Sequence, residues 1–352
     1  MNHFRLLLCG FGVLLGVLSC VTEFQPDTVS IPVSLVVEGQ ITNQPGPYTI
    51  KLTRTADYSY KSLNLLETGA IVTIDDNQGN RETLTELSSG GIYRTKATGM
   101  QGVAGRTYKV TIVTKNGKRY ESDTEVLRAA PPIQKLYYEY TVEGESLVSA
   151  KNQGWNVYLD MKDPETTGDY YKWDWAHYEG IDICSKKEQL DGRILGLPCC
   201  SPCWDIVRCY NCISVNSDAN INGREISRQF IMRVPYKATS RYYLEVQQQA
   251  ISKGAYTFWK SVRQLTTNTG GLFDAAPATV QGNMHCVSDP ATMVFGYFGA
   301  TGLAEQYIFV DRSTGQGTPD VDAPFYVPDR AACVECENSL YRTPVTPRWW
   351  SY

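Results

Sequence analysis

The sequence predicts a mainly β protein: an N-terminal Ig-like β-sandwich, then a second β-rich domain with one substantial helix and a disulfide-rich insertion. Tyrosine is unusually frequent, with 23 copies among 352 residues, and Tyr, Thr and Val favour pleated, half-buried strands. Short apolar runs alternate with clusters of Gly, Asn, Asp and Pro, which is the pattern of strands separated by turns. Both observations favour sheets over helices.

The beginning of the chain has the features of an export signal that ends at a lipidated cysteine. Arg5 supplies a positive start, and Leu6–Leu18 form an apolar run too short to span a bilayer comfortably. A small residue stands directly before Cys20, which is the pattern that lipoprotein signal peptidase reads. We therefore expect residues 1–19 to be a signal peptide, Cys20 to carry the lipid and residues 20–31 to form a tether. An ordinary cleaved signal or a buried helix is the alternative.

Charge and length limit the classes of protein that the remainder can belong to. Without residues 1–19 the chain keeps 352 − 19 = 333 residues, enough for two ordinary domains. The whole chain has a formal net charge of −4, and a nucleic-acid-binding protein would instead need a basic stripe. No later stretch reaches the roughly 18 consecutive apolar residues of a membrane-spanning helix. We expect the lipid to be the membrane attachment, and we expect no nucleic-acid partner.

Residues 32–130 are predicted to form the Ig-like sandwich. Strands are expected at 33–39, 48–53, 70–74, 107–112 and 119–122. Asn116-Gly117 predicts a tight hairpin turn between the last two, with positive φ at both positions. The stretch Asp75–Asn80 resembles part of a calcium loop, but its glycine is misplaced and the terminal glutamate is missing, so a turn is the better interpretation.

Residues 131–352 are predicted to form the second β-rich domain. The boundary lies at Ala129–Pro132, because consecutive prolines stiffen the chain and cannot continue a strand ladder. Strands are expected at 155–160, 170–178, 230–234 and 241–249. Ser252 is a candidate cap for one helix, which we expect to lie over a sheet edge or end. Its apolar residues share one face at helical spacing: Ala255, Phe258, Trp259, Val262 and Leu265.

Cysteines are concentrated in the segment 184–212, and we interpret them as a disulfide framework. An exported chain meets an oxidising compartment, and the spacing inside the cluster is too short for a usual paired-knuckle zinc site. Cys286 stands alone and is our candidate for the unpaired thiol; its neighbour His285 would point to the opposite face of a strand. The disulfide candidates are Cys184, Cys199, Cys200, Cys203, Cys209, Cys212, Cys333 and Cys336.

Residues that suggest a ligand or catalytic site are few. Tyr171, Trp173 and Trp175 alternate along one strand, and we favour a buried core row over a ligand platform. A loop with Asp311, Asp320 and Asp322 is more consistent with solvated carboxylates than with a cation site. The sequence contains no nucleophile elbow, phosphate loop, dinucleotide fingerprint or His-Glu-x-x-His motif. We therefore expect no catalytic residues, no metal and no cofactor.

Several segments, in their order, resemble one known family over essentially the whole mature chain. They are 35–42, 45–48, 69–74, 105–108, 169–173, 258–260, 282–283 and 296–298, then Cys333-x2-Cys336 and Trp349-Trp350. This order is similar to that of DUF4249, a family of Bacteroidota lipoproteins. The resemblance implies an outer-membrane lipoprotein, often encoded beside a TonB-dependent receptor and acting as its surface accessory. It supplies no catalytic residues.

The function expected from these observations is that of a surface-tethered, non-enzymatic binding or accessory subunit of a TonB-dependent nutrient uptake system. We expect it to be lipid-anchored in the outer membrane and exposed at the cell surface. An extracellular enzyme acting on glycans or peptides is the first alternative, and a deep cleft holding two facing acids would favour it. A structural or adhesive surface module is the second.

Overall fold

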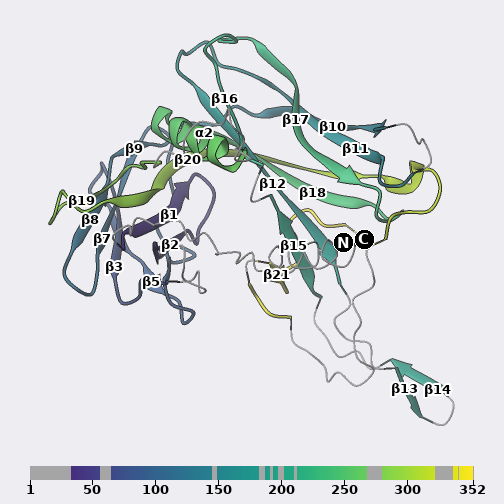
Figure 1. Ribbon diagram of the computed structural model, residues 1–352, viewed down its shortest axis with the longest axis horizontal. Coiled ribbons are helices and arrows are strands. Elements are labelled where there is room, and N and C mark those ends of the chain that lie inside the picture. The colour runs from purple at the N-terminus through teal and green to yellow at the C-terminus, as the bar shows by residue number, and fades with distance from the viewer. Residues whose placement is uncertain are drawn as a thin grey trace, which may run out of the picture.

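The computed structural model describes residues 33–55, 65–144, 149–181, 187–190, 193–196, 202–209, 212–267, 280–321, 336–339 and 341–351. Within them the chain is mainly β, as predicted, with several sheets and one long helix. Figure 1 shows two lobes, with the early strands in one and the strands of the middle of the chain in the other. The signal peptide, Cys20 and the tether lie outside the described residues.

The first lobe contains mostly short strands. They are β1 (Leu35–Thr42), β2 (Thr49–Arg54), β3 (Ile71–Asp76), β4 (Arg81–Thr83), β5 (Thr85–Glu86), β6 (Ile92–Arg94), β7 (Thr107–Val113), β8 (Arg119–Ser122), β9 (Glu125–Val126) and β19 (Met284–Cys286).

The second lobe contains longer strands and the helices. They are β10 (Ile133–Val142), β11 (Gln153–Lys162), β12 (Tyr170–Gly180), β13 (Lys187–Leu190), β14 (Arg193–Gly196), β15 (Trp204–Arg208), β16 (Ser214–Ser217), β17 (Glu225–Pro235), β18 (Tyr242–Ile251), α2 (Lys253–Thr267), β20 (Val294–Val310), the 3-10 turn η1 (Arg312–Thr314) and β21 (Arg342–Thr343).

One ten-stranded sheet runs through both lobes, in the order β21-β15-β12-β18-β20-β1-β2-β6-β5 with β16 beside β12. In the first lobe a six-stranded sheet, β19-β8-β7-β3-β4 with β9 beside β7, forms the second layer. In the second lobe the second layer is the three-stranded sheet β10-β11-β17. Each lobe is therefore a β-sandwich, and we call them the first and second sandwich.

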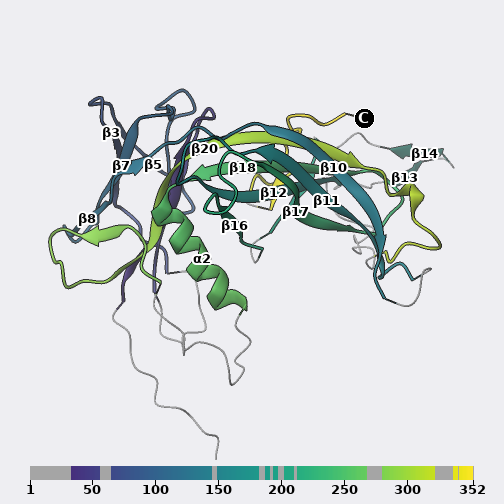
Figure 2. The same cartoon turned by 90° about the horizontal axis from the view of Figure 1, so that it is seen from above.

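The strand β20 belongs to both sandwiches. Its first half pairs in parallel with β1, from Leu35↔Val294 to Thr42↔Thr301, and its second half pairs antiparallel with β18. The strand β19 also returns to the first sandwich, where it pairs with β8. The predicted division at residue 130 must therefore be amended, because residues 284–301 complete the first sandwich rather than the second. The turn of the sheet along β20 can be followed in Figure 2.

Each sandwich has its own hydrophobic core. In the first, Val37, Ile50 and Ile112 are fully buried in the cluster that fills the space between the layers. In the second, Trp155 and Leu244 are fully buried, and the aromatic residues of β12 pack against the same cluster. The alternation of apolar and polar residues in the sequence predicts which face of each strand is buried, because residues two apart on a strand share one side of the sheet.

The junction between the sandwiches is closely packed around the proline linker. A Cβ on Gly302 would lie 2.0 Å from the carbonyl oxygen of Arg128, so only glycine lets β20 pass the linker there. The Gln248 amide donates to the carbonyl of Pro131 at 2.6 Å. The linker 129–132 therefore contacts β18 and β20, in addition to joining two strands along the chain.

The predicted hairpin and helix are both present. β7 and β8 pair around Asn116-Gly117, but only Gly117 has positive φ, at 81°. The Thr114 N–H donates to the carbonyl of Lys118, and the Gly117 N–H donates to the carbonyl of Thr114. The loop is therefore a three-residue turn and not the predicted two-residue one. Ser252 caps α2, whose Ala255 N–H donates to the Ser252 hydroxyl at 3.0 Å.

Candidate functional site

The described residues line a cleft between α2 and the end of the first sandwich. Its volume is about 910 Å³, within the usual range of ligand pockets. We call it the α2 cleft. It is lined by Asp123, Thr124, Glu125, Ser252, Lys253, Gly254, Thr257, Phe258, Ser261, Gln264, Leu265, Val280, Gln281, Gly282, Asn283 and Tyr297. Figure 2 shows α2 lying across the sheet beside β16 and β20.

Aromatic packing holds α2 against the sheet. Phe258 lies 5.2 Å from Tyr297 of β20 between ring centroids, and Tyr256 lies 5.0 Å from Tyr170 of β12. Gly254, in the first turn of the helix, leaves space for the Tyr297 hydroxyl, because a Cβ on residue 254 would lie 2.6 Å from that oxygen. Of the apolar face predicted from the sequence, Ala255, Phe258 and Trp259 therefore pack toward the sheet, as expected for an amphipathic helix. Leu265, near the end of the helix, is exposed instead.

Glu125 is the centre of a buried hydrogen-bond network at the floor of the cleft. Glu125 is only 6 % exposed. The Tyr297 hydroxyl donates to Glu125 Oε1 at 2.5 Å, and the Asn283 amide lies 3.4 Å from the same oxygen. The Ser252 hydroxyl is 3.1 Å from the Tyr297 hydroxyl. Four segments distant in sequence, including the helix cap, therefore meet at this one carboxyl.

The environment of Glu125 favours its neutral form. Burial raises the pKa of Glu125 above its ordinary value, and this outweighs the opposing effect of the hydrogen bonds from Tyr297, Ser252 and Asn283. Its Oε2 is buried without a hydrogen-bond partner among the described residues. Burial also raises the pKa of Tyr297, and its hydrogen bond to Glu125 adds to that shift. Burial of this pair therefore favours the protonated forms of both side chains.

Asn283 connects the cleft floor to the backbone of β20. Its Nδ2 donates to the carbonyl of Phe298 at 2.8 Å, and its Oδ1 accepts from the Phe298 N–H at 3.0 Å. Gly282 and Gly296 pass each other closely, because a Cβ on Gly282 would lie 1.4 Å from the Gly296 oxygen. Gly296 itself has a φ of 90°, where a side chain would be strained.

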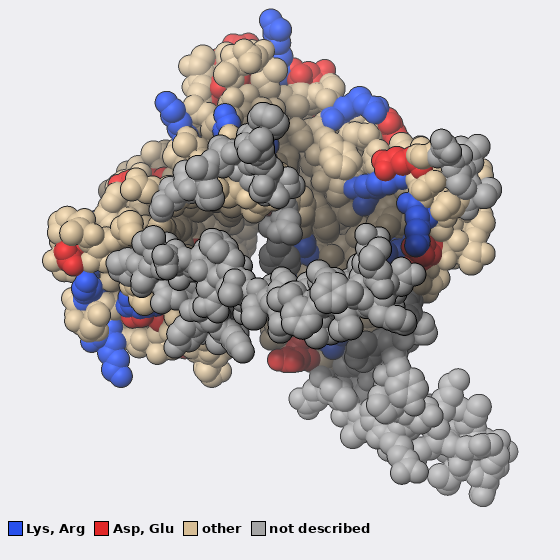
Figure 3. All heavy atoms as spheres, in the orientation of Figure 1, with Lys and Arg blue, Asp and Glu red and all other residues tan. Residues whose placement is uncertain are grey.

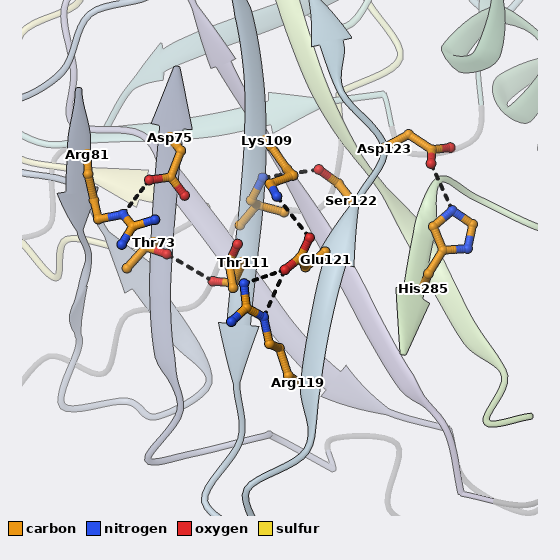
Figure 4. A network of polar contacts seen from close by, with 11 residues as sticks. Thr73, Asp75, Arg81, Lys109, Thr111, Arg119, Glu121, Ser122, Asp123 and His285 are labelled. Carbon is orange, nitrogen blue, oxygen red and sulfur yellow. Dashed lines mark hydrogen bonds and ion pairs between the residues drawn. The ribbon is translucent and has the colours of Figure 1, made fainter. Parts of the chain in front are cut away.

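The rim of the cleft continues into a charged sheet face of the first sandwich. Figure 4 shows Asp123 and His285 facing each other, and His285 Nε2 lies 2.9 Å from Asp123 Oδ1. On the neighbouring strands Lys109 and Arg119 both contact Glu121, and the hydrogen bond from Lys109 is the main cause of a lowered pKa at Glu121. This face is solvated, and exposed ion pairs of this kind each contribute little stability.

The face shown in Figure 3 carries no large field of one sign. Basic and acidic side chains lie interspersed over the second sandwich, where Arg228 holds Glu139 through both guanidinium NH groups. The described residues on this face therefore form no basic stripe of the kind that nucleic-acid binders use.

The aromatic row predicted as core is core. Tyr171 and Trp173 are 1 % and 2 % exposed, and Trp175 packs against the same cluster. The ligand-platform alternative for these rings is therefore wrong. His177 is also buried, and its ring stacks on Tyr242 with centroids 3.5 Å apart.

The structure brings four of the candidate cysteines into two disulfides, Cys203–Cys336 and Cys209–Cys212. Cys286 is a buried free thiol on β19, with His285 exposed beside it, as expected for neighbours on a strand. The other four disulfide candidates lie outside the described residues: Cys184, Cys199, Cys200 and Cys333.

Each of the two aspartate motifs considered as a cation site contains one aspartate, Asp76 or Asp311, that caps a local turn. Asp76 accepts from the N–H groups of Gln78 and Asn80 at 2.9 Å each, so the 75–80 stretch is a turn, as predicted. Asp311 accepts from the Ser313 N–H at 2.9 Å and caps η1, while Asp322 is outside the described residues. The described part of the chain contains no group of three or more metal-ligating side chains.

Sequence reasoning missed the residues that form the cleft floor. Glu125 follows a strand-like run without any motif, and Tyr297 and Asn283 lie about 160 or more positions away from it. Only two signals pointed to this place: the cap at Ser252, and the pairs Gly282-Asn283 and Gly296-Tyr297, which belong to the family resemblance.

Two β-sandwiches that share one strand, with a cleft under a capped helix at their junction, define the class of this protein. Its sequence matches the family described as a domain of unknown function (DUF4249) over residues 21–306. The chain therefore belongs to DUF4249. A comparison with curated proteins found no match. Among the described residues, the helices are too short or too polar to cross a bilayer.

Proposed function

We propose that this protein is a surface-tethered, non-enzymatic binding subunit of an outer-membrane, TonB-dependent nutrient uptake system, attached to the membrane by a lipid on Cys20. The apolar run Leu6–Leu18, followed by Ser19 and then Cys20, supports the attachment. The order of sequence segments supports the setting, because it resembles that of lipoproteins often encoded beside such receptors.

The observation that carries the proposal is the α2 cleft. A preformed cavity of about 910 Å³, with an aromatic wall and a buried polar floor, has the properties of a ligand site. Its floor is fixed by Tyr297, Asn283 and the helix cap, so a ligand would meet a pre-ordered surface. A receptor-associated protein with such a cleft would deliver its ligand to the receptor.

Lipid attachment is tested by labelling the full chain with radioactive fatty acid in a bacterium that has an outer membrane. The wild type and the control Cys9→Ser should be labelled and recovered with membranes. Cys20→Ser should lose the label and leave the membrane fraction. Unlabelled wild type, or label retained in Cys20→Ser, would remove the basis of the anchored arrangement.

The accessory role is tested by gentle detergent extraction of outer membranes from the native organism. We expect the protein to purify together with a TonB-dependent receptor, at a fixed ratio that survives gel filtration. Recovery as a lone protein under conditions that keep other receptor complexes intact would contradict this part of the proposal.

A hydrolase acting on extracellular glycans is a second candidate, and one observation favours it. The α2 cleft is lined by two acids in different environments: Asp123 at the exposed rim, and Glu125 buried with a raised pKa. Such a difference is how glycosidases divide the roles of acid and base. Hydrolysis of a glycan that is lost in both Glu125→Gln and Asp123→Asn would replace the binding proposal with this one.

A further inference from the structure

The wall of the cleft formed by α2 is a stripe of small polar side chains. Thr257, Ser261 and Gln264 are four and three residues apart and therefore share one face of the helix. Phe258 and Leu265 flank the stripe, and Leu265 is 38 % exposed. The cleft thus presents hydrogen-bonding groups next to apolar ones along one helix face.

The polar groups of the cleft include both acceptors and donors. Thr257 and Ser261 donate their hydroxyl protons to the carbonyls of Lys253 and Thr257, at 3.0 Å each, which leaves their oxygen lone pairs free to accept. Within the described part of the chain the side-chain amides of Gln264 and Gln281 have no hydrogen-bond partner, so their N–H groups remain as donors. A ligand rich in hydroxyl groups, which donate and accept at once, matches this set.

The charges of the cleft do not suit an anionic ligand. Asp123 already pairs with His285 at the rim, and Glu125 is held by Tyr297 in the floor. Lys253 is the one cation among the described lining residues, whereas phosphate or carboxylate ligands are typically held by paired or bidentate cations. The lining therefore favours an uncharged ligand.

An extended peptide fits this cleft less well than a saccharide does. Peptides often bind by adding a strand to an open sheet edge, but the backbone of α2 is hydrogen-bonded within the helix and offers no such edge. On the α2 wall of the cleft, recognition must therefore come from side chains. A sugar presents hydroxyls at its rim and C–H groups on its face, which can pair with Gln264 and pack against Phe258 at the same time.

We propose that the α2 cleft binds an uncharged oligosaccharide, with Gln264 and Gln281 as hydrogen-bond donors, Thr257 and Ser261 as acceptors and Phe258 as the apolar contact. This assignment rests on the proposed binding function and adds the class of ligand to it. The cleft volume of about 910 Å³ leaves room for more than one sugar ring.

The test is calorimetric titration of the full-length protein in detergent micelles. The probes are short neutral oligosaccharides of gluco, manno, xylo and galacto configuration, compared with uronate oligosaccharides and uncharged peptides. At least one neutral saccharide should bind in preference to the other two classes. The double variant Gln264→Ala/Gln281→Ala should weaken that binding about tenfold or more, as expected for lost ligand hydrogen bonds.

Gln78→Ala is the matched control, because Gln78 is an exposed glutamine in a turn of the first sandwich and should leave the affinity unchanged. Preference for uronates or peptides, no binding of any neutral saccharide, or unchanged affinity in the double variant would overturn the assignment. A protein that purifies with its receptor but binds no neutral saccharide would lose the ligand class and keep the accessory role. A protein that binds a neutral saccharide but is recovered without a receptor would keep the ligand class and lose the accessory role.

Discussion

The hydroxyl of Tyr297 donates a 2.5 Å hydrogen bond to Oε1 of Glu125, and this contact joins residues that are 172 positions apart. Glu125 belongs to the first sandwich, whereas Tyr297 lies on the strand that both sandwiches share. The Ser252 hydroxyl, 3.1 Å from that of Tyr297, extends the link to the cap of α2. A single buried carboxyl thus couples the placement of the helix to the first sandwich.

Tyr297→Phe should therefore destabilise the protein by about 1–3 kcal/mol, because it removes a buried donor from Glu125 while keeping the ring. Urea denaturation followed by tryptophan fluorescence measures the change. Tyr256→Phe is the control: this ring packs against Tyr170, and its hydroxyl makes no hydrogen bond among the described residues. Equal effects of the two variants would contradict the role assigned to the Tyr297 hydroxyl.

Two glycines of β20 provide a matched test of the junction. A Cβ on Gly302 would lie 2.0 Å from the Arg128 oxygen, whereas a Cβ on Gly299 would meet its nearest neighbour at 3.4 Å. Gly302→Ala should therefore destabilise the fold by about 1–3 kcal/mol or more through overpacking, and Gly299→Ala should change it far less. Thermal unfolding measures both. A Gly302→Ala protein as stable as Gly299→Ala would show that the linker can move away from β20.

The disulfide Cys203–Cys336 ties the C-terminal segment to β15 across a separation of 133 residues. Arg342 adds an ion pair to Asp205 at 2.6 Å in the short pairing of β21 with β15. By the chain-entropy argument, a cross-link of this length contributes about 5 kcal/mol or less.

Cys336→Ser should therefore lower the thermal midpoint and speed proteolytic removal of the C-terminal segment. Glu337→Ala, a change at the exposed neighbouring residue, should do neither. If the Cys336→Ser protein resists protease as the wild type does, the strand pairing and the Arg342 ion pair are sufficient to hold the segment.

Local signals predicted the local structure. The strands with alternating burial, the hairpin at Asn116-Gly117 and the helix after Ser252 were all found, because each depends on residues near one another in sequence. The burial of Tyr171 and Trp173 followed from the same alternation.

Long-range pairing was not predicted. The segment 294–310 contains three glycines and no polar alternation, so it carried no clear strand signal, yet it forms the strand shared by both sandwiches. Glu125 was missed for a related reason: its burial is produced by Tyr297 and Asn283, which the fold brings from far along the chain. A single carboxylate in a sequence gives no indication of its later desolvation.

The raised pKa of Glu125 predicts a particular dependence of stability on pH. In the unfolded chain the carboxyl ionises near the ordinary value of about 4.3, whereas in the folded protein burial keeps it protonated to higher pH. Between these two pKa values the folded state binds more protons than the unfolded state, so the free energy of unfolding must fall as pH rises. This contribution is fully present at acid pH and is lost as pH passes through the folded pKa.

Glu125→Gln removes that titration while it retains an oxygen acceptor for Tyr297. The stability of the variant relative to the wild type should therefore improve as pH rises from about 4 to 8, since other groups cancel in the difference. Glu86→Gln is a control of opposite sign: burial opposes it, but hydrogen bonds from the N–H groups of Gly69 and Gly91 lower the pKa of Glu86. The free energy of unfolding that Glu86→Gln loses relative to the wild type should become smaller as pH falls. Urea denaturation measures both trends, between about pH 4 and 8 for Glu125→Gln and below the ordinary carboxyl pKa of about 4.3 for Glu86→Gln. Parallel curves for Glu125→Gln and wild type would show that folding does not raise the pKa of Glu125.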